Sequence, residues 1–350
     1  MSTENIPDKK VESVCPYCGV GCLLTYNVKD DKILFAEGRD GPANLSRLCV
    51  KGRYGFDYIH NDGRLTKPLI RKKGVSKDID IRSYDFDNID EIFEETTWEN
   101  ALDVAINGFK NVKEQKGPSG LAGFGCAKGS NEEAYLFQKL VRTGFKNNNV
   151  DHCTRMCHAS SVAALMETIG SGAVTAPVSE IKNAEVAIVI GARPTQNHPV
   201  AATFIKNAVK NNGLKLIIMD PRKQDLSRIS EKSLQFTPGA DVALLNAMIN
   251  TIIEEGLVDR QYIEKNTEGY KELKEHIKDF TPEEMEKVCG IEANEIRETA
   301  RLFANAKSAM IFWGMGISQH IHGTDNSRCL ISLAMITGNI GRDGTGLHPL

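Results

Sequence analysis

Nine cysteines occur among the 350 residues, and four of them fall within the first 50 positions. Three stand in the short run Cys15-Pro-Tyr-Cys18-Gly-Val-Gly-Cys22, and Cys49 follows after 26 intervening residues. Glycines within such a run let the backbone wrap closely around a compact metal cluster. Structural zinc usually draws its ligands as two separated pairs, and Cys49 has no cysteine or histidine paired with it. The spacing therefore predicts one [4Fe-4S] cluster on these four thiolates, with zinc as the alternative.

A second group with chemical potential is Arg155-Met-Cys157-His158. Positive charge on Arg155 or His158 would stabilise a thiolate at Cys157. The alternative is an inert, buried cysteine, which behaves as a small apolar residue. Cys153, four residues earlier, would share a helix face with Cys157 and is the second candidate for a metal ligand. The sequence thus favours a reactive or metal-binding cysteine at one of these two positions.

The elements that must position these residues follow a βαβ rhythm from Trp98 onward, because short apolar runs that end at a glycine or a turn alternate with helical patterns. This alternation predicts an α/β fold with a parallel sheet, whose ligands bind beyond the carboxyl ends of the strands. The predicted strands are Leu121–Phe124, Val186–Ile190, Leu216–Met219 and Met310–Trp313. The predicted helices are Glu132–Thr143, Pro199–Asn211, Asp241–Glu255, Ala293–Ala304 and Asp325–Thr337.

The N-terminal part predicts a small, loop-rich domain. Leu23–Val28 and Ile33–Ala36 are β-prone and are joined by Lys29-Asp-Asp-Lys32, which indicates a hairpin. The charged segment Arg71–Glu95 shows little periodicity and is expected to be a surface excursion or a link between domains.

Composition excludes several classes of protein. Apolar residues make up 41% and charged residues 25% of the chain, as in ordinary globular proteins. The net charge of −3 does not indicate a nucleic-acid-binding protein. Residues Met1–Val14 contain neither an apolar signal sequence nor paired arginines, so we expect a cytoplasmic protein. No run approaches the roughly 18 apolar residues of a membrane span, so we expect no direct membrane insertion.

Three stretches resemble molybdopterin-dependent formate dehydrogenases, most closely the catalytic α subunit of the soluble, NAD-linked enzymes. They are the C-P-Y-C-G-V-G-C run, Leu48-Cys-Val-Lys51-Gly-Arg53, and the stretch Arg155-Met-Cys-His-Ala-Ser-Ser-Val-Ala163. The resemblance implies that Cys157 ligates molybdenum or tungsten and that His158 is the active-site histidine. It also implies that Lys51 lies between the cluster and the pterin, where a solvated surface lysine is the alternative.

The resemblance extends to loops that contact the family's cofactor, a bis(molybdopterin guanine dinucleotide). Glycines and helix N-termini in such loops suit pyrophosphate groups. Arg328 matches the arginine that faces formate, since a guanidinium can hold a carboxylate through two parallel hydrogen bonds; a helix arginine in a surface ion pair is the alternative. The implied cofactor-binding residues are Gly191, Asp220, Arg222, Gly239, Asp241, Gly314 and Gly316.

The implied fold is a small [4Fe-4S] domain followed by parallel-sheet α/β domains of the formate dehydrogenase/DMSO reductase type, without the family's C-terminal barrel domain. We expect residues 1–68 to form the cluster domain and residues 69–150 a pterin-binding domain that residues 331–350 rejoin. Residues 151–330 would form a dinucleotide-type domain that carries the metal-ligating cysteine. The chain is expected to be truncated at Leu350.

The implied activity is oxidation of formate to carbon dioxide. Electrons would leave through the [4Fe-4S] cluster to partner subunits that carry flavin or iron–sulfur centres, and finally to NAD. Three alternatives stay open: a nitrate reductase of the same superfamily, an electron-transfer subunit like the large iron–sulfur subunit of respiratory complex I, and a fragment that binds only the cluster.

Overall fold

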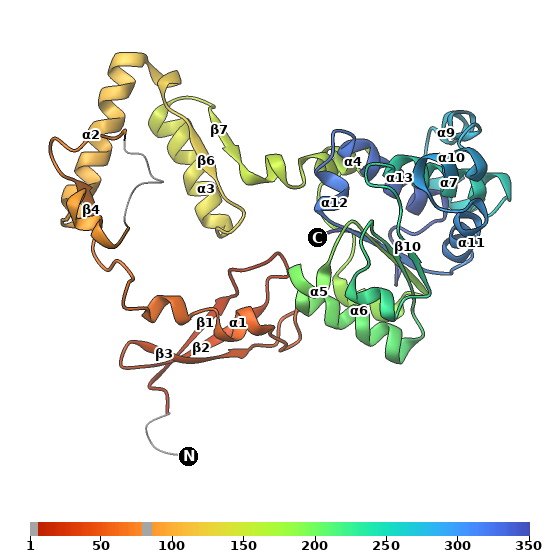
Figure 1. The fold of residues 1–350 in the computed structure, drawn as a ribbon, viewed down its shortest axis with the longest axis horizontal. Helices are drawn as coiled ribbons and strands as arrows, with labels where there is room; N and C mark the ends of the chain where they lie inside the picture. The colour runs from red at the N-terminus through yellow and green to blue at the C-terminus, as the bar shows by residue number, and fades with distance from the viewer. Residues whose placement is uncertain (1–5, 79–85) are drawn as a thin grey trace. The chain divides into compact units, whose positions relative to one another are not determined.

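The computed structural model of the chain describes residues 6–78 and 86–350. These residues form two units, which are considered separately: unit 1 comprises Met1–Tyr54 and Thr154–Leu350, and unit 2 comprises Gly55–Cys153 (Figure 1). In the described ranges, no helix combines the length and the apolar composition that crossing a bilayer requires.

The N-terminal part of unit 1 is a three-stranded antiparallel sheet in the order β1-β2-β3, with β1 at Lys9–Val14, β2 at Leu23–Lys29 and β3 at Lys32–Gly38. The predicted hairpin is confirmed. Its two turn residues, Asp30 and Asp31, have φ of 49° and 58°, the left-handed conformation that matches the twist of paired strands. The cysteine run lies between β1 and β2, and the short helix α1 (Val50–Tyr54) begins directly after Cys49.

The larger part of unit 1 is built on a five-stranded sheet in the order β10-β9-β8-β11-β12, in which every neighbouring pair is parallel. This confirms the predicted parallel α/β fold, and three of the predicted strands agree with it to within a residue. The strands are β8 (Val186–Ile190), β9 (Lys215–Met219), β10 (Lys232–Leu234), β11 (Ala309–Trp313) and β12 (Gly346–Pro349).

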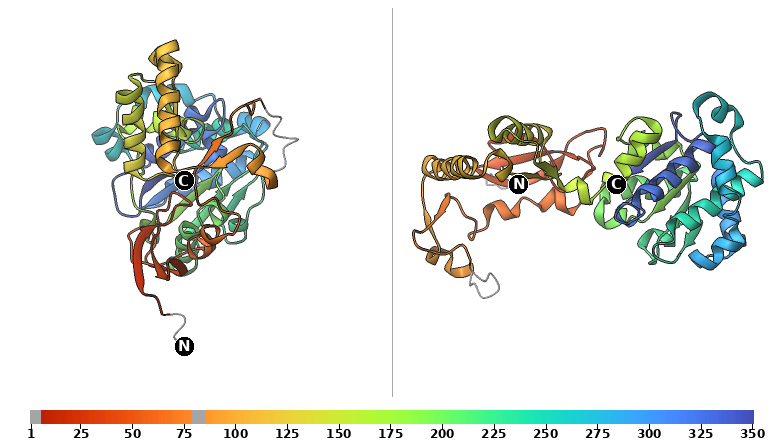
Figure 2. Two further views of the ribbon diagram at one scale, coloured as in Figure 1. Left: turned by 90° about the vertical axis from the view of Figure 1, so that its left-hand side faces the viewer. Right: turned by 90° about the horizontal axis from the view of Figure 1, so that it is seen from above.

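Alternate residues of the central strands enter two different cores, because successive side chains point to opposite faces of a sheet. Ile188 and Trp313 pack with the helices of one face, whereas Val189 and Phe312 pack on the other face with α6 (Pro199–Asn212). Helices therefore cover both faces of the sheet (Figure 2). The first face is covered by α4 (Ala159–Ile169), α7 (Asp241–Glu254), α11 (Ala293–Ala304) and α13 (Gly323–Ile336).

The cluster domain packs against the second face. Cys15, Cys22 and Leu24 belong to the same buried apolar group as α6 and the sheet residues beneath it. The cysteine run is thus held on the core of the α/β part of unit 1 and is not an independent loop.

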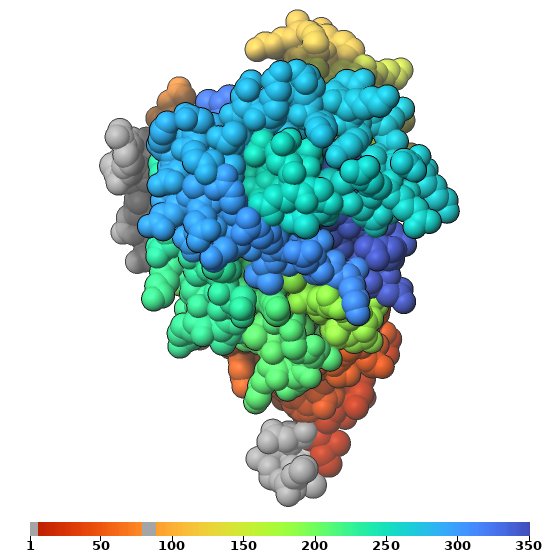
Figure 3. All heavy atoms as spheres, turned by 90° about the vertical axis from the view of Figure 1, so that its right-hand side faces the viewer, coloured from red at the N-terminus to blue at the C-terminus, as the bar shows by residue number. Residues whose placement is uncertain are grey.

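The remaining helices of unit 1 are short. Those between α7 and α11 gather over one face of the unit, which Figure 3 shows as a continuous cover of cyan to blue side chains. The short helices are α5 (Pro194–Asn197), α8 (Arg260–Asn266), α9 (Tyr270–Ile277), α10 (Pro282–Cys289) and α12 (Met315–Ser318), with 3-10 turns η7 (Val178–Asn183) and η8 (Asp225–Arg228). The 3-10 turn η6 (Cys153–Met156) contains the boundary between the two units.

Unit 2 contains two small strand pairs and two main helices. The pair β4 (Leu69–Arg71) and β5 (Phe93–Glu95) is antiparallel, and β6 (Gly123–Gly125) and β7 (Val150–His152) form a parallel βαβ crossover. Its helices are α2 (Trp98–Lys116) and α3 (Asn131–Lys139), the latter continuing as the π-helical turn η5 (Leu140–Phe145). The expected excursion Arg71–Glu95 contains β5 and a 3-10 turn at Phe86–Glu91, while residues 79–85 lie outside the described ranges.

Residues 331–350, which we expected to rejoin residues 69–150, lie in unit 1. Residues 331–336 complete α13, and β12 pairs with β11 at the edge of the five-stranded sheet. The backbone hydrogen bonds between β12 and β11 hold this segment in unit 1.

Candidate active site

The cysteine run forms a closed loop at the start of the cluster domain. The Cys15 N–H donates to the Cys22 carbonyl at 2.9 Å, and Gly21 turns the chain with φ +67°. Cys15 and Cys22 are buried, while Cys18 and Cys49 are partly exposed. Gly52 packs close to the loop, since a Cβ there would lie 3.1 Å from Leu48 Cδ2 and 3.6 Å from Cys15 Sγ.

The electrostatics of these thiols fit a metal cluster. Burial, and after it the nearby thiols of Cys18, Cys15 and Cys49, raise the pKa of Cys22 to about 12. Burial likewise raises the pKa of Cys15, so thiolates in this loop require the positive charge that iron supplies. Across the described residues, no three His, Cys, Asp or Glu side chains converge as ligands of a single metal ion. Three thiols on one loop and a fourth directly before α1, which influence one another electrostatically, suit a four-iron cluster.

A cleft of about 360 Å³ opens at the carboxyl ends of the central strands. Gly191 follows β8, Asp220 follows β9 and Gly314 follows β11. Such a position is where parallel sheets bind their ligands. All seven residues expected to contact the pterin cofactor line this one cleft: Gly191, Asp220, Arg222, Gly239, Asp241, Gly314 and Gly316.

Two of these glycines are required by a close approach of backbones. The Gly316 N–H donates to the Gly191 carbonyl at 2.9 Å, and a Cβ on Gly316 would lie 2.7 Å from the Gly191 Cα. Gly191 also has φ +55°, a conformation that side chains disfavour. The loops after β8 and β11 can therefore meet only as a Gly–Gly pair.

The polar residues of the cleft suit a ligand with both donors and acceptors. Asp220 accepts from the Arg222 N–H at 2.9 Å and from Gln224 Nε2 at 3.3 Å, which orients its carboxylate. Asp241 is buried at the N-terminus of α7, where burial raises its pKa and His320 opposes the shift. The buried Nε of Arg193, which also lines the cleft, has no hydrogen-bond partner among the described residues. An unpaired buried donor of this kind fits a nucleotide-type ligand with phosphate groups.

Cys157 and His158 reach the rim of this cleft. The Cys157 thiol lies 3.4 Å from the Met315 Sδ, and Met315 lines the cleft. His158 Nε2 lies 2.7 Å from the carbonyl oxygen of Leu350, another lining residue. Because a carbonyl only accepts, Nε2 carries the proton, and Nδ1, at 3.2 Å from Ser161 Oγ, is the accepting nitrogen of the neutral ring. Burial lowers the pKa of His158, and the bond to Leu350 partly offsets this.

Ser161 is a site residue that the sequence reasoning did not single out. Its Oγ accepts from the Trp313 indole N–H at 2.9 Å and lies 3.3 Å from Ser327 Oγ. The three side chains are fully buried and orient the His158 ring from below the cleft. The only signal available was the position of Ser161 within the quoted stretch after Cys157.

Lys51 lies between the cysteine loop and the cleft. Its Nζ approaches the Gln196 carbonyl at 3.5 Å, and the next two residues, Asn197 and His198, line the cleft. Lys51 also acts on both sides electrostatically, since its charge lowers the pKa of Cys15 and of His198, although burial has the larger effect on each. The expected position of Lys51 between the cluster and the pterin stays a prediction.

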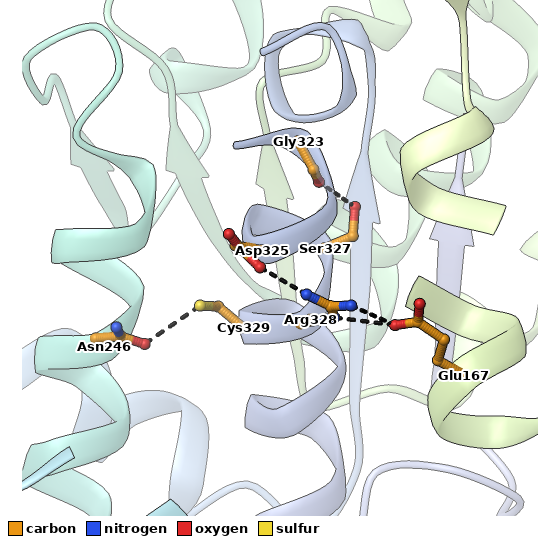
Figure 4. Close-up of polar contacts among 7 residues, drawn as sticks. All are labelled: Glu167, Asn246, Gly323, Asp325, Ser327, Arg328 and Cys329. Atoms are coloured by element: carbon orange, nitrogen blue, oxygen red, sulfur yellow. Dashed lines mark hydrogen bonds and ion pairs between the residues drawn. The ribbon is translucent and has the colours of Figure 1, made fainter. Parts of the chain in front are cut away.

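Arg328 is not among the residues that line the cleft. Its guanidinium, 45% exposed, donates to Glu167 and, at 2.8 Å, to Asp325 (Figure 4). Glu167 stands nine residues beyond His158, which is about 13 Å along the axis of α4. Two carboxylates already pair with this guanidinium, so formate would have to displace one of them to bind there. The arrangement matches the surface ion pair that was the alternative for Arg328.

Cys153 does not share the setting of Cys157. It belongs to unit 2, where its Sγ accepts a hydrogen bond from the Ala127 N–H at 3.1 Å. The segment that joins the two cysteines is a 3-10 turn, so they do not lie one above the other on an α-helix. Of the two candidates, Cys157 is the one whose thiol contacts a residue that lines the cleft.

A thiol loop suited to an iron–sulfur cluster, held on a parallel α/β sheet with a nucleotide-type cleft, defines a class of redox protein with a bound organic cofactor. Comparison with known families identifies the class. Residues 64–350 match the molybdopterin oxidoreductase family and residues 8–61 match its Fe4S4 domain, so the chain belongs to the molybdopterin oxidoreductases. Its cofactors are those of the family, a molybdopterin-bound molybdenum and a [4Fe-4S] cluster.

Similar proteins include the α subunit of an F420-dependent formate dehydrogenase from Methanocaldococcus jannaschii, which is 41% identical over 98% of this chain and 48% of its own length. Formate dehydrogenase H of Escherichia coli is 39% identical over 98% of this chain and 46% of its own length. Acetylene hydratase from Pelobacter acetylenicus shares the fold, with a TM-score of 0.82 at 23% identity over 97% of this chain and 44% of its own. The chain thus spans about half the length of these relatives.

Proposed function

We propose that this chain is part of the catalytic subunit of a formate dehydrogenase, which converts formate to carbon dioxide, one proton and two electrons. The observation that carries the proposal is the arrangement of Cys157 and His158 at the rim of a cleft that contains all seven expected cofactor contacts. The two formate dehydrogenases described above, similar to this chain along nearly its whole length, support the choice of substrate.

When bound, the molybdenum–pterin group, or its tungsten counterpart, supplies the two-electron redox chemistry. The cleft loops that follow β8, β9 and β11 would hold its nucleotide part, with Asp220 as an acceptor and Arg222 as a donor. The Cys157 thiolate would be the protein's ligand to the metal. These assignments need no movement of the loops, since the residues already share one cleft.

His158 is the proton-handling residue in this proposal. The Leu350 carbonyl holds Nε2–H in place, and Nδ1 faces the buried Ser161, so the ring would have to turn away from Ser161 before Nδ1 takes up a substrate proton. The depressed pKa keeps the ring neutral and able to accept near pH 7. The exposed pair of Arg328 with Glu167 gives no support for Arg328 as the formate-binding group.

Electrons would leave along the side of the cleft where Lys51 approaches Gln196, toward the four cluster cysteines. From there we expect transfer to partner subunits that carry flavin or iron–sulfur centres. NAD stays a prediction for the final acceptor, and the F420 dependence stated for the Methanocaldococcus relative is an alternative.

The test is elemental analysis of the complete enzyme that contains this chain, combined with formate-dependent reduction of a viologen dye. We expect molybdenum or tungsten, about four irons from this cluster in addition to those of any partner, and dye reduction that requires formate. A protein fully loaded with metal and pterin that ignores formate but uses nitrate would disprove the proposed substrate.

A further inference from the structure

Two exposed cysteines of unit 2, Cys126 and Cys153, follow directly from the ends of two paired strands. In the parallel ladder of β6 and β7, Gly125 pairs with His152, and the next residue on each strand is a cysteine. Neighbouring strands lie about 4.7–4.9 Å apart, and disulfides join Cα atoms about 4.4–6.8 Å apart. The register therefore indicates that the Cα atoms of the two cysteines lie at a separation that a disulfide can join.

The side chain of Cys153 is turned toward the other strand. Its Sγ lies 3.1 Å from the backbone nitrogen of Ala127, the residue after Cys126. Two backbone bonds separate that nitrogen from the Cys126 Cα, so the sulfur lies no more than about 6 Å from this Cα. Rotation about the Cα–Cβ bond of Cys126 would direct its sulfur toward that of Cys153, and a small movement of the chain would close the remaining gap to a bond of about 2 Å.

A shared metal ion is the other chemistry that two cysteines could provide here. His152 is the nearest further ligand, with Nδ1 at 3.9 Å from the Cys153 Sγ. Within the described part of the chain, however, no three potential ligands gather around one point. The pair thus lacks the third and fourth ligands that a stable zinc site requires.

We propose that Cys126 and Cys153 form a reversible disulfide by exchange with a low-molecular-weight disulfide. The Cys153 thiolate attacks that disulfide and releases one thiolate, which leaves Cys153 in a mixed disulfide. The Cys126 thiolate then attacks the Cys153 sulfur and displaces the second thiolate. Two protein thiols are oxidised, one small disulfide is reduced to two thiols, and His152 is within reach to take the proton of Cys153.

The disulfide would close a 28-residue loop that contains α3, η5 and β7. It would also restrain the chain at Cys153, directly after β7 and four residues before Cys157. Exposed disulfides are reduced more readily than buried ones, so this bond would respond to changing redox conditions and would not be a permanent staple.

The experiment uses the complete, cofactor-loaded protein, incubated anaerobically with glutathione buffers of increasing oxidised share. The samples are then acid-quenched, alkylated and digested. Mass spectrometry should find the peptide that links Cys126 to Cys153 rising to the majority form, and dithiothreitol should reverse it. Cys126→Ser and Cys153→Ser should each abolish the linked peptide, whereas Cys329→Ser in unit 1 should leave its yield unchanged.

Several outcomes would overturn the proposal. They are separate glutathione adducts on the two cysteines without the linked peptide, a link from Cys153 to a different cysteine, or protection of both thiols by stoichiometric zinc. Hydrogen exchange tests the restraint independently. Amides of residues 151–157 should exchange at least about threefold more slowly in the oxidised protein, and unchanged rates would refute the restraint on this segment.

Discussion

His348 in β12 should make unit 1 sensitive to acid. The ring is 1% exposed and stacks on Phe312 with centroids 4.6 Å apart, and neither ring nitrogen has a hydrogen-bond partner among the described residues. Burial lowers its pKa from 6.5 to about 4. The unfolded chain therefore binds a proton that the folded chain rejects. The contribution of His348 to the free energy of unfolding is present in full above about pH 6.5 and is lost as the pH falls toward 4.

The size of this loss follows from the two pKa values. With 6.5 in the unfolded chain and about 4 in the folded one, the free energy of unfolding should fall by about 2 kcal/mol between pH 7 and pH 5. His348→Leu cannot take up this proton, so its unfolding free energy should be about 2 kcal/mol less sensitive to the same change. The comparison between the two proteins cancels other groups that titrate in this range.

The assay can be confined to the relevant unit, because the chain has two tryptophans and one of them, Trp313, lies in β11 opposite Pro349 of β12. In a Trp98→Phe background, guanidinium unfolding followed by fluorescence reports the sheet of unit 1. His276→Leu, at an exposed position of α9, is the matched control and should keep the wild-type pH dependence. Equal losses in wild type and His348→Leu would refute the reasoning.

Four further predictions concern the site. Cys22→Ser should lower the iron reconstituted by the isolated chain well below about four per molecule, and unchanged iron with a reducible signal would remove Cys22 from the ligand set. Cys157→Ser should abolish formate oxidation at any formate concentration while the cluster signal persists; if Cys153→Ser alone does this, the two cysteines have been assigned in the wrong order. Arg328→Ala should cost under about 1 kcal/mol of stability and leave kcat/KM for formate within about threefold, because its ion pairs are exposed. A ten- to hundredfold loss of kcat/KM would instead show that Arg328 binds formate. Gly316→Ala places a Cβ 2.7 Å from the opposing backbone, so we expect it to destabilise the protein by about 1–3 kcal/mol. We also expect less bound pterin, which is measured by releasing the cofactor. Full retention of pterin would show that the two loops can separate.

Local patterns predicted those parts of the fold that depend on local physics. Val186–Ile190 forms β8 as predicted because its five buried residues face helices on both sides, which requires a continuous apolar run. The hairpin was likewise readable from two β-prone runs around Asp30 and Asp31. The strand β12 was not foreseen, since Gly-Leu-His-Pro carries no strand pattern and forms only because β11 offers a free edge to pair with.

Site residues were predictable to the extent that their neighbours in sequence determine their place. The loops at Gly191, Asp220 and Gly314 converge because each follows a strand of one parallel sheet. By contrast, the partner of Arg328 is Glu167, 161 positions away on α4, and nothing near Arg328 in the sequence records that pairing. The same holds for Ser161, whose indole partner comes from β11.

The edge strand connects the acid-sensitive histidine with the candidate active site. Two residues after His348, Leu350 donates its N–H to the Trp313 carbonyl at 2.8 Å, which continues the pairing of β12 with β11. The carbonyl of the same residue accepts from His158 Nε2 at 2.7 Å. The position of the catalytic candidate's ring therefore depends on an edge strand that contains a buried histidine without hydrogen bonds. Among the described residues, β12 is held on its outer side only at Leu347, whose carbonyl accepts from the Thr175 N–H at 3.2 Å and whose N–H donates to Thr175 Oγ1 at 2.8 Å, whereas the central strands pair with a strand on each side. We therefore expect β12 to separate before the central strands do, and His158 would then lose the partner that fixes its tautomer before unit 1 unfolds.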